Sequence, residues 1–271
     1  MIGLAIGLPK HGKTQVLQDY VNAHALQNRF FWSDKTEDTP RDSYRWRGTK
    51  WKDWSPRLAR VLRFAGITSL PVATDRPWFG DAPPPGPDAL RWAESLPTTG
   101  VFRFGYPWTG LEVAQLAVDV GNVTIVDDEI DFMALHAGWN NNPLREVCHR
   151  GRHLPNRHGV MGEVHVLGAM RRPQNCHIDL TTLADFVWMF RTRGFRTLQR
   201  LVDDSLIQPE ELEQVKSLPK FHYRLWTVDQ DRPVWGRTLP VPGAPALTEV
   251  ADELGLDPEL EVDDGDVEID E

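Results

Sequence analysis

The stretch that decides the fold is Ile2-Gly3-Leu4-Ala5-Ile6-Gly7-Leu8-Pro9-Lys10-His11-Gly12-Lys13-Thr14. It joins a short apolar run to the pattern G-x-x-x-x-G-K-T, which is the spacing of a phosphate-binding loop. Glycines at both ends of such a loop allow its backbone N–H groups to converge on an anion. Apolar residues recur at helical spacing between positions 15 and 27. The loop is therefore expected to lie between a buried strand and a helix.

The expected ligands of this loop are ATP and Mg²⁺. The ammonium group of Lys13 would reach the β- and γ-phosphates, and the hydroxyl of Thr14 would ligate Mg²⁺. The helix that follows would direct its positive N-terminal end toward the phosphates. The residues expected to bind the nucleotide are Gly7, Leu8, Pro9, Lys10, His11, Gly12, Lys13, Thr14 and Gln15.

A second informative run is Val123-Thr124-Ile125-Val126-Asp127-Asp128-Glu129, an apolar strand that ends in three acids. In nucleotide triphosphatases one acid at this place holds the Mg²⁺ hydration shell, and a neighbouring Glu orients or deprotonates the attacking water. Asp127 is a metal candidate because it is the first acid after the apolar run. The familiar Asp-Glu pair instead favours Asp128 at the metal and Glu129 as the base. The sequence leaves both assignments open.

Short apolar runs alternate with helical periodicity along the rest of the chain. Strands are expected at 29–32, 101–104, 123–126, 163–170 and 186–190, and a terminal strand or hairpin at 221–235. Helices are expected at 15–27, 58–65, 88–96, 111–120, 143–153 and 210–216. This alternation predicts an α/β fold with a mainly parallel sheet covered by helices on both faces. The loop and the acidic strand would then meet at the carboxyl edge of the sheet, where ligands bind in open α/β folds.

The charge distribution separates a near-neutral body from an acidic end. Eleven of the 39 acidic residues lie in 251–271, which has no Lys or Arg, so 28 acids face 30 basic residues elsewhere. We expect a nucleotide-binding domain at 1–240 and a disordered, solvated tail at 241–271. The alternative is that the tail folds back on a basic DNA-binding surface as a competitor.

Residues 33–99 are expected to be an insertion or a partner-docking element. Between positions 41 and 63, eight basic residues are interleaved with Tyr44, Trp46, Trp51 and Trp54. Basic groups among flat aromatic rings suit a nucleic-acid backbone and unstacked bases. The alternative is that the tryptophans pack inside a subdomain and the basic groups cover its surface.

Other signals exclude several protein classes. Cys148 and Cys176 form no C-x-x-C pair and no disulfide framework, so two reduced thiols are expected. No apolar run approaches the roughly 20 residues needed to span a bilayer. The N-terminus leads directly into the first expected strand, unlike a cleaved signal peptide.

The order of these features resembles the FtsK/HerA superfamily of ring-forming, DNA-pumping ATPases. Within it, the chain is most similar to the genome-packaging ATPases of tailless, membrane-containing double-stranded DNA viruses. The resemblance covers about 1–34 and 100–195. It includes Arg150-Gly151-Arg152-His153, Arg171-Arg172-Pro173 and the strand that ends at Phe190-Arg191. The family usually has Gln where Arg171 stands, as a polar sensor of the γ-phosphate, so here a cation would sense this phosphate.

The resemblance implies a homo-oligomeric ring, commonly a hexamer, with ATP and Mg²⁺ bound between subunits. Such a ring would move double-stranded DNA into a preformed capsid, act with capsid vertex proteins, and work in the host cytoplasm or at the packaging vertex of the virion. An arginine from the neighbouring subunit would neutralise charge on the γ-phosphate. Arg150 and Arg152 are the first candidates for this arginine, and Arg191 and Arg193 the second. The expected catalytic set is Lys13, Glu129, Arg150, Arg152 and Arg171.

Three alternatives share parts of this pattern. A phage assembly or export ATPase of the zonular-occludens-toxin-like kind typically carries a membrane-spanning segment, which the sequence lacks. A small-molecule phosphotransferase would place the phosphoryl group on an acceptor other than water. A nucleotide-gated binding module has no need of a base such as Glu129.

Overall fold

The computed structural model describes residues 1–24, 27–33, 79–105, 107–228 and 234–238. These residues form one nine-stranded sheet in the order β11-β10-β9-β1-β8-β5-β2-β4-β3. The strands are β1 Ile2–Ile6, β2 Arg29–Ser33, β3 Phe79–Asp81, β4 Gly100–Phe104, β5 Val123–Asp127, β8 Val164–Met170, β9 Phe186–Phe190, β10 His222–Thr227 and β11 Val234–Arg237. The seven strands from β9 to β3 are parallel, and β10 and β11 form the antiparallel terminal hairpin. The predicted mainly parallel sheet is confirmed.

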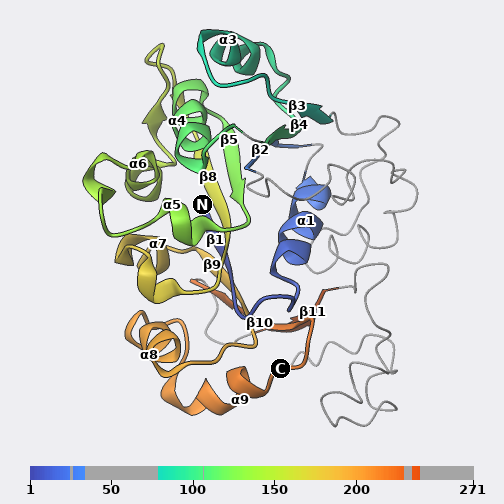
Figure 1. The fold of residues 1–271 in the computed structure, drawn as a ribbon, viewed down its shortest axis with the longest axis vertical. Helices are drawn as coiled ribbons and strands as arrows, with labels where there is room; N and C mark the ends of the chain where they lie inside the picture. Colours follow the sequence, from blue (N-terminus) through green and yellow to red (C-terminus); the bar gives the residue numbers. More distant parts are fainter. Residues whose placement is uncertain (25–26, 34–78, 106, 229–233, 239–271) are drawn as a thin grey trace.

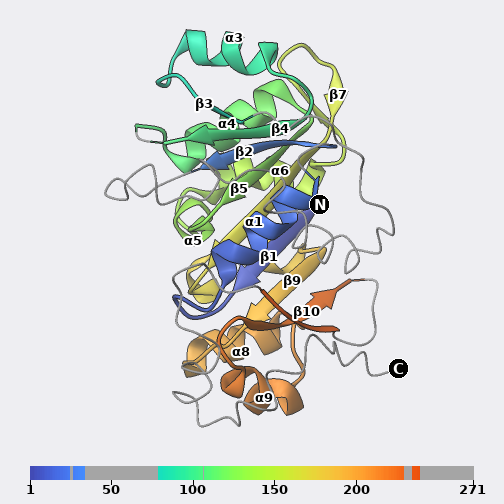
Figure 2. The same ribbon diagram turned by 90° about the vertical axis from the view of Figure 1, so that its right-hand side faces the viewer.

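Helices cover both faces of this sheet (Figure 1). They are α1 Lys13–His24, α3 Pro87–Ser95, α4 Gly110–Val120, α5 Ile130–Met133, α6 Pro143–Arg150, α7 Ile178–Thr182, α8 Phe195–Asp203 and α9 Leu212–Ser217. Helix α1 lies on one side of the sheet, and α4 to α7 lie on the other. Figure 2 shows α3 near one end of the twisted sheet and α8 and α9 near the opposite end. None of the described helices has the length and apolar character needed to cross a membrane.

The two faces of the sheet have separate apolar cores because strand side chains alternate between faces. On β1, Leu4 and Ile6 pack with the core beneath α3 to α9, whereas Ala5 packs with Val16 and Leu17 of α1. All five residues are buried. Burial on both faces explains why β1 reads as a continuous apolar run rather than an alternating one.

Some elements differ from the sequence expectations at their ends or were not expected. Helix α6 ends at Arg150, and the chain then forms a small antiparallel hairpin of β6, Leu154–Pro155, and β7, Met161–Gly162. Helix α8 was also not expected, because a polar and arginine-rich stretch masks its short apolar face. The expected helix at 58–65, the aromatic and basic stretch at 41–63 and the tail at 241–271 lie outside the described residues.

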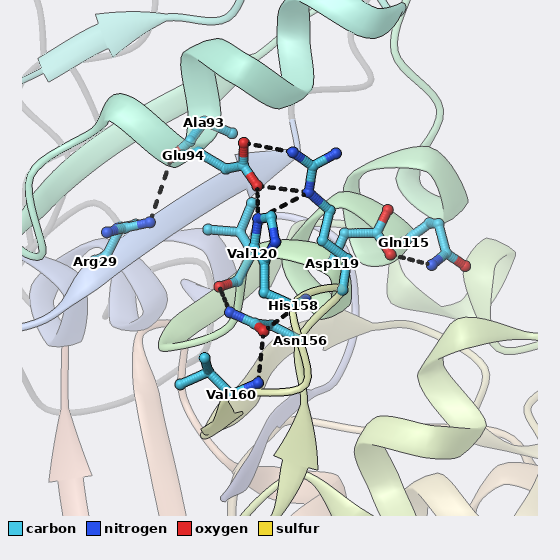
Figure 3. A network of polar contacts seen from close by, with 10 residues as sticks. Arg29, Ala93, Glu94, Gln115, Asp119, Val120, Asn156, His158 and Val160 are labelled. Carbon is cyan, nitrogen blue, oxygen red and sulfur yellow. Dashed lines mark hydrogen bonds and ion pairs between the residues drawn. The ribbon is translucent and has the colours of Figure 1, made fainter.

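Polar contacts tie α3 to the sheet at the amino-terminal edge (Figure 3). The guanidinium of Arg29, at the start of β2, donates to the carbonyl oxygens of Ala93, Leu96 and Pro97 at the end of α3. Arg29 is buried, and these carbonyls belong to the negative end of the helix dipole. Glu94 of α3 also accepts hydrogen bonds from Arg157 in the hairpin loop. Residues within the predicted insertion thus pack on the sheet, and β3 pairs with β4.

Candidate nucleotide-binding site

The phosphate-binding loop and the acidic strand meet at the carboxyl edge of the sheet. Strand β8 lies between β1 and β5, with Met170 beside Ile6 and Gly168 beside Asp127. The N–H of Gly7 donates to the carbonyl of Met170 at 3.3 Å, and the N–H of Leu8 donates to the carbonyl of Arg191 at 2.9 Å. The loop is thereby anchored to the ends of both neighbouring strands. The predicted convergence at one edge is confirmed.

Gly12 is required by both the backbone conformation and the packing of the loop. Its φ is +105°, and a Cβ atom there would lie 2.6 Å from Oγ1 of Thr238. Ring atoms of Phe190 and Phe221 would lie 3.2 Å from the same Cβ. These neighbours come from β9 and from the two ends of the terminal hairpin. The antiparallel end of the sheet therefore forms the wall behind the loop.

Lys13 is curled over its own loop. Its Nζ donates to the carbonyl oxygens of Gly7 at 2.7 Å and Leu8 at 2.8 Å. Burial and the nearby guanidinium of Arg171 together lower the pKa of Lys13 to about 8, although the charge of Asp128 opposes the shift. The buried ammonium of Lys13 and the more exposed guanidinium of Arg171 thus repel each other, and an anion placed between them would be stabilised.

The three acids after β5 have different environments. Asp127 is fully buried, and its Oδ1 accepts a hydrogen bond from the backbone N–H of Glu129 at 2.8 Å. A Cβ atom on Gly110, at the start of α4, would lie 2.9 Å from Oδ2 of Asp127. The carboxylate of Asp127 is therefore turned into the strand end and toward α4, where it shapes the turn.

Asp128 instead faces the loop. The hydroxyl of Thr14 donates to its carboxylate, and the ammonium of Lys13 is close enough to stabilise its negative charge. Burial and the neighbouring acids nevertheless raise the pKa of Asp128 to about 6. Its Oδ1 is buried and has no hydrogen-bond partner within the described part of the chain. A hydroxyl and an unpartnered carboxylate oxygen side by side form a donor set that fits Mg²⁺.

Glu129 and Arg171 form an ion pair across the site. Nη2 of Arg171, just beyond the end of β8, lies 2.9 Å from Oε1 of Glu129. The side chains remain 53% and 34% exposed, respectively, so water and ligands can reach both. The expected base and the expected γ-phosphate sensor therefore contact each other directly.

Arg150 and Arg152 lie at the opposite edge of the sheet from the loop of their own subunit. Arg152 donates to Asp185 at 3.0 Å, and Asp185 also accepts the N–H of Ile2 at the start of β1. Arg150 lies 3.6 Å from Glu146 on α6. The length of β1, about 13 Å, separates this edge from the phosphate-binding loop. The side chains of Arg150 and Arg152 are 59% and 70% exposed, respectively.

Cations from distant parts of the chain surround His11 in the loop. Burial, together with the charges of Arg191, Lys13, Lys220 and Arg193, lowers the pKa of His11 to about 4. His11 is therefore neutral near pH 7. Sequence reasoning missed Lys220, because it follows α9 in a segment without a motif and only the terminal hairpin brings it close to the loop.

The remaining expected nucleotide contacts differ in accessibility. Pro9 and Lys10 are exposed at the tip of the loop, and Leu8 is partly exposed. Gln15 is buried in the first turn of α1, where its amide donates to Asp19 at 3.0 Å. The Gln15 side chain is therefore engaged within its own helix.

Comparisons with known proteins find similar folds among solved structures. No protein-family model and no curated protein sequence matches the chain. The genome packaging NTPase B204 of Sulfolobus turreted icosahedral virus 2, in complex with ATP-gammaS, superposes with a TM-score of 0.56 at 16% identity. That match covers 88% of this chain and 98% of B204. VirB4 of Thermoanaerobacter pseudethanolicus matches with a TM-score of 0.51 at 8% identity, over 89% of this chain and 90% of VirB4. Together with the loop and the acidic strand, these likenesses show that this chain has the P-loop NTPase fold expected from its sequence.

Proposed function

We propose that this protein is an ATP-driven double-stranded DNA translocase that packages a viral genome into a preformed capsid. The observation that carries the proposal is the contact between Thr14 and Asp128, which joins the two halves of a nucleotide site at one sheet edge. The fold shared with the genome packaging NTPase B204, which was solved with ATP-gammaS and AMPPCP, supports the packaging function.

In this proposal the loop N–H groups and Lys13 bind the β- and γ-phosphates. Thr14 and Asp128 hold Mg²⁺, which supplies positive charge to the phosphate oxygens when it is bound. Glu129 accepts the proton of the attacking water as the new P–O bond forms and the bond to the ADP oxygen breaks. Asp128 is preferred over Asp127 at the metal because Asp127 already holds the strand-end turn.

We infer that the protein acts as a homo-oligomeric ring, a hexamer in the first instance, with ATP between subunits. Arg150 and Arg152 are suited to a role in a neighbouring subunit, since they are exposed and far from their own loop. Their present partners are the exposed Glu146 and the partly buried Asp185; because both arginines are themselves exposed, these ion pairs are screened and contribute little. Arg191 and Arg193 rank second because, unlike the first pair, they lie near the loop of their own subunit.

The ring would grip DNA through phosphate contacts that carry no sequence information. Its partners would be capsid vertex proteins, and its place of action the host cytoplasm or the packaging vertex of the virion. The domain division into an ATPase domain at 1–240 and an acidic tail at 241–271 belongs to the same proposal.

DNA-stimulated ATP hydrolysis by the assembled protein tests this function. We expect Lys13→Ala to abolish hydrolysis, because it removes the ammonium group that this proposal places on the β- and γ-phosphates. Lys216→Ala is the matched control, since Lys216 is a half-exposed lysine on α9 with an acidic partner, Glu213. Hydrolysis that an assembled ring carries out at the same rate with and without DNA would refute translocation. Phosphate recovered on a small molecule would instead identify a phosphotransferase.

A further inference from the structure

The positively charged groups at the triphosphate site already have protein acceptors. The ammonium of Lys13 donates to the carbonyl oxygens of Gly7 and Leu8. The guanidinium of Arg171 donates to the carboxylate of Glu129. Both cations are therefore held in place by groups that a phosphate can replace.

Arg171 and Lys13 border the same space. Arg171 directly follows Met170, whose carbonyl oxygen accepts a hydrogen bond from the N–H of Gly7. The carbonyl oxygen of Gly7 accepts in turn from Nζ of Lys13, and the charge of Arg171 contributes to the lowered pKa of Lys13. Glu129 and Asp128 act on Lys13 in the opposite sense, so the carboxylates border this space as well. A γ-phosphate bound by Lys13 would lie within reach of Arg171.

We propose that the Arg171–Glu129 ion pair is a latch that keeps the base occupied until a γ-phosphate binds and takes over Arg171. The proposal rests on the ATPase function inferred above and adds its regulation. With ADP or without nucleotide, the carboxylate of Glu129 stays hydrogen-bonded to the guanidinium, so its Oε1 is occupied by that bond. With ATP, Arg171 turns to the γ-phosphate, and Oε1 of Glu129 can turn to the water and accept its proton.

The exchange is favourable for two physical reasons. An ion pair in which both side chains are a third or more exposed contributes little, because water and salt screen it. A guanidinium bound to phosphate makes stronger, charge-assisted hydrogen bonds, and the anion also relieves the repulsion between Lys13 and Arg171. ADP has no γ-phosphate and leaves the pair intact, so the latch distinguishes ATP from ADP.

Binding measurements test the first half of the latch. Isothermal titration of Mg·ADP and of Mg²⁺ with a non-hydrolysable ATP analogue would be carried out on the full chain and on Arg171→Gln. We expect Arg171→Gln to weaken the analogue by about 10-fold and to leave ADP affinity within about twofold. Arg172→Gln is the matched control, because it removes the same charge from the adjacent exposed residue, and it should change neither affinity. An equal loss for both nucleotides, or no loss for either, would overturn the proposal.

Structures of the full chain with each nucleotide test the second half. We expect the 2.9 Å contact between Nη2 of Arg171 and Oε1 of Glu129 to persist with Mg·ADP and to be absent with the ATP analogue. Arg171→Lys, which keeps the charge but not the planar guanidinium, serves as a second variant for binding. A contact that persists in the analogue complex would refute the latch.

The latch and the proposed function fail in different ways. If the full chain hydrolyses ATP with DNA stimulation while the pair stays closed in the analogue complex, only the latch is wrong. If the pair opens with the analogue but hydrolysis does not depend on DNA, the latch stands and DNA translocation is wrong. A chain that binds neither nucleotide refutes both.

Discussion

The replacement of Gly12 by alanine tests the account of the loop most directly. At Gly12 the φ of +105° is one that residues with a Cβ rarely adopt, which costs about 1–3 kcal/mol. The new Cβ would lie 2.6 Å from Oγ1 of Thr238 and 3.2 Å from two phenylalanine rings, so the neighbours must shift at a further cost of about 1–3 kcal/mol. Restriction of the unfolded chain by alanine returns about 0.4–1 kcal/mol. We therefore expect a net loss of about 1–6 kcal/mol in the free energy of unfolding.

Chemical denaturation at 25 °C measures this loss, and titration with an ATP analogue should show weaker binding as well. Gly105→Ala is the matched control, because a Cβ there meets nothing within 4 Å and its φ lies outside the range that disfavours a side chain. The control should be neutral or slightly stabilising, by about 0.4–1 kcal/mol. If Gly12→Ala were as stable as the control, the packing of the loop against the terminal hairpin would be wrong.

Two further predictions concern stability. The folded pKa of Asp128, about 6, lies above its ordinary value of 3.8, so the fold favours the protonated carboxyl. The stability that this protonation contributes is fully present below pH 4 and is lost as the pH rises through 6. Asp128→Asn keeps an acceptor for the hydroxyl of Thr14. It should raise the free energy of unfolding of the metal-free protein by about 3 kcal/mol at pH 7, with little gain at pH 3.5. Denaturation in EDTA between these pH values measures this difference. Arg29→Ala should cost about 2–4 kcal/mol, because it leaves the carbonyl end of α3 buried without its donor. Arg157→Ala breaks contacts with Glu94 and His158 near the surface and should cost less than about 1 kcal/mol. Equal effects of the two arginine variants on the unfolding midpoint would contradict this assignment.

The sequence by itself determined the phosphate-binding loop, the acidic strand and the α/β class. These features depend on local patterns: the loop has a fixed spacing of glycines and Lys-Thr, and strands such as β1 and β9 are short apolar runs between polar segments. Their carboxyl ends face one edge because parallel strands joined by helices must do so. The prediction that Asp128 and Glu129 lie at that edge followed from the alternation of strands and helices expected from the sequence.

The tertiary structure decided which groups meet at that edge. The contact between Arg171 and Glu129 joins residues 42 positions apart, and its existence depends on β8 lying next to β5. Strand order and register are set by packing between distant segments, which no local pattern encodes. The same holds for Lys220 near the loop and for the different orientations of Asp127 and Asp128. Local periodicity thus identified the parts of the site, and only long-range pairing determined which side chains are partners.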